Sequence, residues 1–200
     1  MKRRATLTSS RRVSHMTGAI AVSSWSCAAM LAAALAWSCN DPVHDAQVDA
    51  LGPESAGVSP GPTHRPGKPC LTCHGGQGPA ELELGVAGTI YKTAAPDSPP
   101  LAGATVTIYD ATQQPDGGAP HTVVTNAAGN FYFPRTAWAP FFPLHDIAVS
   151  YPGVETPTLM HTNVGRDGSC ASCHFDPKGA NTHGHVYFVL EAADFPGGTP

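Results

Sequence analysis

Glycine and proline interrupt this chain throughout its length. The 200 residues include 21 glycines and 20 prolines, and only 13% of them are Asp, Glu, Lys or Arg. Glycine and proline end helices and form turns, so this composition favours short strands over a helical bundle. Aromatic residues make up 8% of the chain, which predicts a modest core that covalent or metal cross-links would help to stabilise.

Seven segments from residue 86 onward have the pattern of short β-strands. In one of them, Val106 and Ile108 alternate with the polar Thr105 and Thr107, as on a half-buried strand. A glycine-containing turn at 127–129 joins two others as a hairpin. The predicted strands cover residues 86–91, 104–110, 121–126, 130–133, 145–151, 156–163 and 185–190. Seven short strands with frequent turns predict an all-β, immunoglobulin-like two-sheet sandwich, and no helix is expected.

Three of these segments resemble a known family. The sequences are GTIY at 88–91, LAGATV at 101–106 and TNAAGNFYF at 125–133, and they are similar to the carboxypeptidase regulatory-like domain. The resemblance covers residues 85–151 and implies a seven-stranded, transthyretin-like sandwich. It implies no catalytic activity by itself, because function depends on sites rather than on folds.

A second feature, the motif C-x-x-C-H, occurs twice. It is formed by Cys70, Cys73 and His74, and again by Cys170, Cys173 and His174. Two cysteines at this spacing can form thioether bonds to one porphyrin, and the next histidine can bind its iron as the proximal ligand. The sequence therefore predicts two haem c groups, in segments 68–84 and 168–184 that flank the strands.

Two non-haem interpretations of the cysteines stay open. In an oxidising compartment the four cysteines could form two disulfides, and two C-x-x-C pairs could hold zinc. Neither interpretation requires a histidine directly after each second cysteine. The sixth iron ligands are not determined by a motif, and each single candidate is more often a surface or packing residue than a ligand. The candidates are His64, Met160, His161, His183 and His185.

The first 39 residues have the features of an export signal. They contain five Lys or Arg, no acidic residue, and an apolar stretch from about residue 17 to 37. The residues before Cys39 resemble a bacterial lipoprotein cleavage box, which implies that Cys39 is lipidated and anchors the protein to a membrane. Residues 40–67 are predicted to be a disordered tether, because they are too rich in proline, glycine and polar residues to bury a core.

These features predict an exported, lipid-anchored electron carrier of the periplasm or cell surface. The combination resembles exported multihaem cytochromes of bacteria. Residues 40–200 contain six Lys or Arg against 15 Asp or Glu, which predicts redox partners with basic patches and excludes nucleic acid as a partner. No catalytic motif is present, although a peroxidase-like haem enzyme is an alternative.

The order of the strands also predicts where the two motifs lie. The first motif precedes the first strand, and the second lies between the sixth and the seventh. If successive strands alternate in direction, both motifs come to the same end of the sandwich, within reach of one another.

Overall fold

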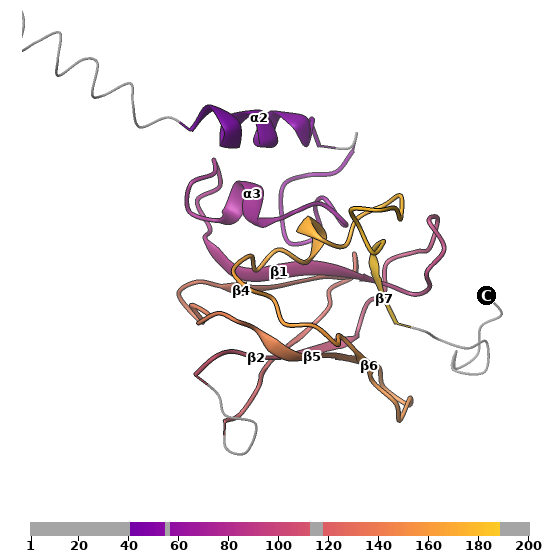
Figure 1. The fold of residues 1–200 in the computed structure, drawn as a ribbon. Helices are drawn as coiled ribbons and strands as arrows, with labels where there is room; N and C mark the ends of the chain where they lie inside the picture. Colours follow the sequence, from indigo (N-terminus) through magenta and orange to yellow (C-terminus); the bar gives the residue numbers. More distant parts are fainter. Residues whose placement is uncertain (1–40, 55–56, 113–117, 189–200) are drawn as a thin grey trace, which may run out of the picture. The chain divides into compact units, whose positions relative to one another are not determined.

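The fold is all-β and contains two sheets (Figure 1). The computed structural model describes residues 41–54, 57–112 and 118–188. Each predicted strand segment overlaps one observed strand. The strands are β1 (Leu84–Tyr91), β2 (Thr105–Tyr109), β3 (His121–Val124), β4 (Asn130–Pro134), β5 (His145–Ser150), β6 (Thr158–Leu159) and β7 (Val186–Tyr187).

The two sheets have three and four strands. The three-stranded sheet has the order β4-β1-β7, and the four-stranded sheet has the order β3-β2-β5-β6. Strand β1 runs antiparallel to β4 and parallel to β7, and the neighbours in the other sheet are antiparallel. All these pairings agree with the predicted alternation of strand direction.

A single hydrophobic cluster joins the two sheets. Val86 and Ile90 of β1 belong to it, together with Val106 and Ile108 of β2 and Val149 of β5. Each of these side chains is less than 5% exposed. The alternating apolar residues of both sheets therefore face one another, which is how a sheet removes one face from water.

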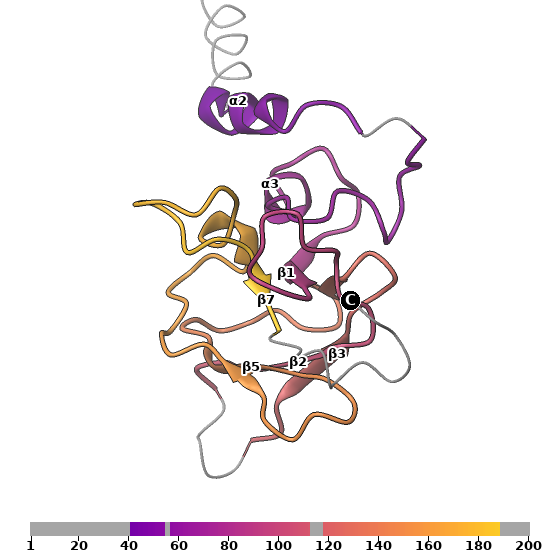
Figure 2. The same ribbon diagram turned by 90° about the vertical axis from the view of Figure 1, so that its right-hand side faces the viewer.

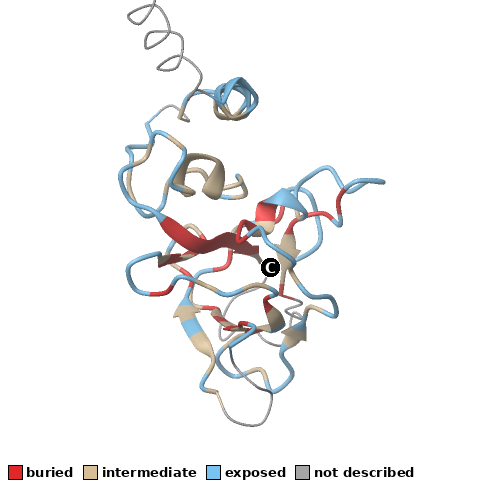
Figure 3. Cartoon of the chain, turned by 60° about the vertical axis from the view of Figure 1, so that its left-hand side comes forward, coloured by how far each residue is buried: buried red, intermediate tan, exposed pale blue. Residues whose placement is uncertain are grey.

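Strand β1 is buried along almost its whole length, as Figure 3 shows. The hydrophobic cluster accounts for one face of the strand. The other face is also covered, since Ala87 and Thr89 are at most 4% exposed. A strand covered on both faces needs small residues where other segments approach it closely. At Gly85 and Gly88, a Cβ atom would lie within 3 Å of Pro140 and Cys170 respectively.

Two helices and one 3₁₀ turn were not predicted from the sequence. Helix α2 (Pro42–Ala50) begins after Asp41, whose side chain accepts hydrogen bonds from the backbone N–H groups of Val43 and His44. An aspartate N-cap followed by proline at the first helical position is a recognisable start signal. The other two are helix α3 (Leu71–His74) and the 3₁₀ turn η1 (Cys170–Ser172).

The segment predicted to be a disordered tether contains α2 and then contacts the three-stranded sheet. The backbone N–H of Gly67 donates to Thr89 Oγ1 at 2.8 Å, and Asn130 Nδ2 donates to the carbonyl of His64 at 2.9 Å. These two hydrogen bonds attach the chain segment that precedes the first C-x-x-C-H motif to strands β1 and β4. Among the described residues, no helix has the length and apolar character needed to cross a bilayer.

Candidate functional site

Both C-x-x-C-H motifs fold into a single helical turn. In each motif, the backbone N–H of the histidine donates to the carbonyl of the first cysteine at 2.9 Å, and that of the second cysteine donates to the same carbonyl at 3.2 Å. The turn brings the two cysteine side chains and the histidine to neighbouring positions. Segments 100 residues apart thus have the same local geometry.

The histidine of each motif is oriented by a backbone carbonyl. His74 Nδ1 lies 2.7 Å from the carbonyl oxygen of Leu82, and His174 Nδ1 lies 3.1 Å from that of Gly184. A carbonyl oxygen only accepts, so Nδ1 carries the proton in both rings and Nε2 carries the free lone pair. No described residue is hydrogen-bonded to either Nε2. This is the arrangement of a histidine prepared to bind a metal through Nε2.

Hydrogen bonds from downstream residues hold each turn in place. Cys73 accepts at its carbonyl from the N–H of Ala80, and Cys173 accepts in the same way from His183. In the second segment, the hydroxyl of Thr182 also bonds to the carbonyls of Cys173 and Phe175. The loop that follows each motif therefore returns to it and supplies the carbonyl that orients the histidine.

The environment of the first cysteine in each motif favours the protonated thiol. Burial raises the pKa of Cys70 to about 11. Burial, followed by the proximity of Cys70 and Asp167, raises the pKa of Cys170 to about 12. Catalytic and redox-active cysteines have lowered pKa values. Burial also lowers the pKa of His174, with a further lowering from His183, which favours the neutral imidazole that binds metals.

The two motifs lie side by side along β1 (Figures 1 and 2). Helix α3 and turn η1 both contact this strand. Ala87 donates its N–H to the carbonyl of Gly168 at 2.9 Å and pairs with Ser169, which places Cys170 directly beside the strand. The predicted proximity of the motifs is confirmed, although they share a strand of the three-stranded sheet rather than a cluster of loops at one end.

Two candidates for the sixth ligand lie at the other sheet. Met160 donates its backbone N–H to the carbonyl of Ile147 in β5, directly after the edge strand β6. His161 is the next residue and is exposed. Both positions follow the edge of the four-stranded sheet, whereas both motifs contact β1 of the three-stranded sheet. Among the described residues, neither Met160 nor His161 has a hydrogen bond, ion pair or ring contact with either motif.

His185, a third candidate, has no free nitrogen. Its Nδ1 bonds to the carboxylate of Asp176, and its Nε2 lies 2.7 Å from the carbonyl of Thr93. The side chain is 5% exposed and its ring lies 4.4 Å from that of Tyr91. Both ring nitrogens are therefore occupied by hydrogen bonds. His185 therefore attaches the second motif's loop to the chain after β1, and this geometry argues against a role as iron ligand.

His183 and His64 each lie beside one proximal histidine. The ring centroids of His183 and His174 are 5.7 Å apart, and those of His64 and His74 are 5.8 Å apart. His183 directly precedes Gly184, whose carbonyl oxygen bonds to Nδ1 of His174 at 3.1 Å. His183 thus belongs to the segment that orients the proximal ring. At the first motif, His64 Nδ1 accepts a hydrogen bond from a backbone N–H at 3.2 Å, which places the ring proton on Nε2.

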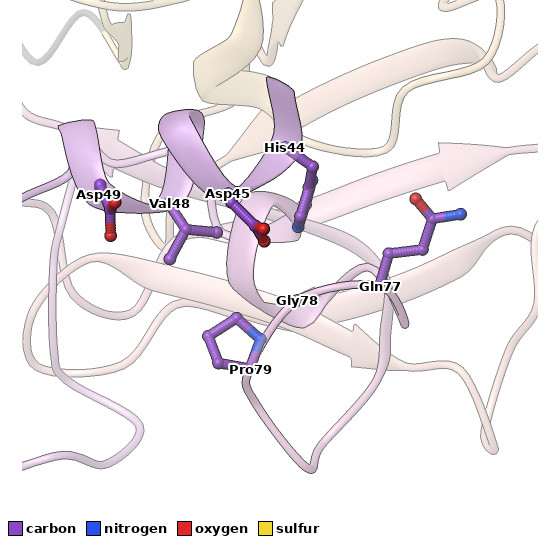
Figure 4. A pocket seen from close by; sticks show the side chains of 7 residues that line it. All are labelled: His44, Asp45, Val48, Asp49, Gln77, Gly78 and Pro79. Carbon is purple, nitrogen blue, oxygen red and sulfur yellow. The ribbon is translucent and has the colours of Figure 1, made fainter. Parts of the chain in front are cut away.

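Sequence reasoning overlooked His44, which it placed in the tether. His44 lies on α2 and lines a pocket with the loop that follows α3 (Figure 4). Its Nε2 is buried and has no hydrogen-bond partner among the described residues. The only available sequence signal was the N-cap Asp41, which marks the helix that presents this side chain. The residues that line the pocket are His44, Asp45, Val48, Asp49, Gln77, Gly78 and Pro79.

The four cysteines of the two motifs form no disulfide. Cys70, Cys73, Cys170 and Cys173 are free thiols. Within the described ranges, no three His, Cys, Asp or Glu side chains gather as a metal-binding group. Cys39 and the export signal lie outside the described residues.

No protein-family model, curated protein or solved structure matches the chain.

Proposed function

We propose that this protein is a dihaem c-type cytochrome that transfers electrons in the bacterial cell envelope. The observation that carries the proposal is the shared geometry of the two C-x-x-C-H turns. In both, the proximal histidine donates its Nδ1 proton to a backbone carbonyl and keeps Nε2 free. A bound haem would supply one-electron chemistry at its iron.

The residues of each motif have separate roles in this proposal. Cys70 and Cys73 would hold one haem through thioether bonds, and Cys170 and Cys173 would hold the other. His74 and His174 would bind the irons, with Leu82 and Gly184 fixing the orientation of their rings. The sheet beneath the motifs would be the rigid support. In its details we propose a transthyretin-like sandwich, as the carboxypeptidase regulatory-like resemblance implies.

The alternatives receive less support from the arrangement of the side chains. A zinc site built from both C-x-x-C pairs would bring four sulfurs together, but the described residues contain no such cluster. Disulfides would not explain why both histidines are held with Nε2 free. A peroxidase would need an iron with an open sixth position and an acid–base group beside it, and it is the second alternative.

The proposal is tested by the mass and haem content of the protein. Expressed in a host that attaches haem c, the mature chain should gain the mass of two haems and stain for haem on a denaturing gel, since thioether bonds survive denaturation. Replacing Cys170 and Cys173 with Ala should remove one haem, and replacing Cys70 and Cys73 should remove the other. An unmodified chain with two disulfides from the same host would contradict the proposal.

A further inference from the structure

The chain segments that lead into the two motifs are fastened to neighbouring residues of one strand. The backbone N–H of Gly67, three residues before Cys70, donates to Thr89 Oγ1 at 2.8 Å. Ser169, directly before Cys170, pairs with Ala87. Ala87 and Thr89 are two residues apart on β1, which separates them by about 7 Å.

Close packing at Gly88 strengthens this arrangement. Gly88 lies between the two fastening points, and a Cβ atom there would be 2.9 Å from Cys170 Cβ. The absence of a side chain thus allows Cys170 to lie against the strand. From Gly67 to Cys70 the chain can extend by at most about 10 Å. Cys70 is therefore held near Thr89, in the same part of β1 that Cys170 packs against.

We infer that the two haems would form a coupled pair, with the edges attached through Cys70 and Cys170 next to each other along strand β1. This inference rests on the proposed function and adds the position of the two haems relative to each other. Cys70 and Cys170 would each hold one porphyrin edge, and the fastening points of their segments on β1 are closer together than a porphyrin is wide. Bound haems would supply one-electron chemistry, and their proximity would allow an electron to pass between them inside a single molecule.

Circular dichroism in the Soret region tests the inference on the full dihaem protein. Two coupled porphyrins give a split signal of two signs, and the wild type should show it. The spectrum should differ from the sum of the two single-haem variants, C70A/C73A and C170A/C173A. A one-signed wild-type spectrum, or one equal to that sum, would overturn the inference. The wild-type spectrum alone decides the matter if a single-haem variant does not fold.

A matched pair of variants at Thr89 tests the role of β1 as the common support. Thr89 is 4% exposed, accepts from Gly67 and donates to Asn130 Oδ1 at 2.7 Å. Thr89→Val keeps the shape but removes both bonds, so the split signal should weaken while two haems remain attached. Thr89→Ser keeps the hydroxyl and should retain the signal. Equal, undiminished signals in both variants would contradict this role of Thr89.

The mass of the same samples separates the two possible failures. A chain that carries two haems but gives a one-signed Soret spectrum would refute the pair and leave the proposed electron carrier intact. A chain without covalent haem would refute the proposed function itself.

Discussion

At the scale of single residues, the orientation of each proximal histidine depends on one backbone carbonyl. Leu82 and Gly184 supply these carbonyls at 2.7 and 3.1 Å. His185 shows the opposite arrangement, because Asp176 and Thr93 occupy both of its nitrogens. The hydrogen-bond partners, rather than the residue type, thus decide which histidines are free to bind iron.

We expect His64 to be the sixth ligand of the first haem. Its Nδ1 now accepts from the N–H of Gly61 at 3.2 Å, so binding through Nε2 requires the proton to move to Nδ1 and this bond to break. In His64→Ala, one of the two haems should change from a low-spin to a high-spin visible and electron paramagnetic resonance spectrum. His44→Ala is the matched control and should leave the spectra unchanged. The reverse result would assign the ligand to His44.

At the scale of elements, the turn between β3 and β4 is packed against the strand that supports both motifs. Ile90 donates its N–H to the carbonyl of Gly129 at 2.9 Å. Gly129 has a φ of 70°, and a Cβ atom there would lie 2.5 Å from the carbonyl oxygen of Ile90. Gly103 has a similar φ of 79°, but a Cβ atom at that residue would have no neighbour within 4 Å among the described residues. Both glycines have a left-handed conformation, but only at Gly129 would a side chain also collide with neighbouring backbone.

Replacing each glycine with alanine should therefore have unequal effects. Gly103→Ala should lower the free energy of unfolding by about 1 kcal/mol, the cost of a left-handed conformation for an L-residue. Gly129→Ala should lower it by at least about 1 kcal/mol more, since backbone must also move. Denaturant unfolding of both variants provides the measurement. Equal losses would mean that the turn can shift away from β1 without cost.

At the scale of the whole molecule, charge is divided between the first 39 residues and the rest. All five Lys and Arg of the first part precede an apolar stretch, whereas 15 Asp and Glu lie in residues 40–200. We propose that the first part directs export and that Cys39 carries a lipid. The acidic remainder would then face redox partners with basic patches, and salt would weaken their association.

Cys39→Ser should release the protein from membranes without changing its haem content. The serine cannot accept the lipid, whereas both C-x-x-C-H motifs stay intact. Fractionation of cells followed by haem staining measures both quantities in one experiment. A wild-type protein that is already released, with an N-terminus other than residue 39, would refute the anchor.

The sequence by itself determined the positions of the seven strands and the two motifs. Strand alternation and the C-x-x-C-H spacing are local properties, because they follow from a two-residue repeat and from a single turn. Helix α2 was missed although its N-cap is equally local, because the surrounding prolines and glycines resemble a linker.

The tertiary structure alone decided which groups meet. Cys70 and Cys170 are 100 residues apart, and only the parallel approach of the chain before Cys170 to β1 brings them together. The carbonyls that orient His74 and His174, and the acceptors that occupy His185, come from loops whose paths depend on long-range packing. Residue types and spacing do not encode such contacts, since they form only when the two sheets and the segments covering β1 have packed.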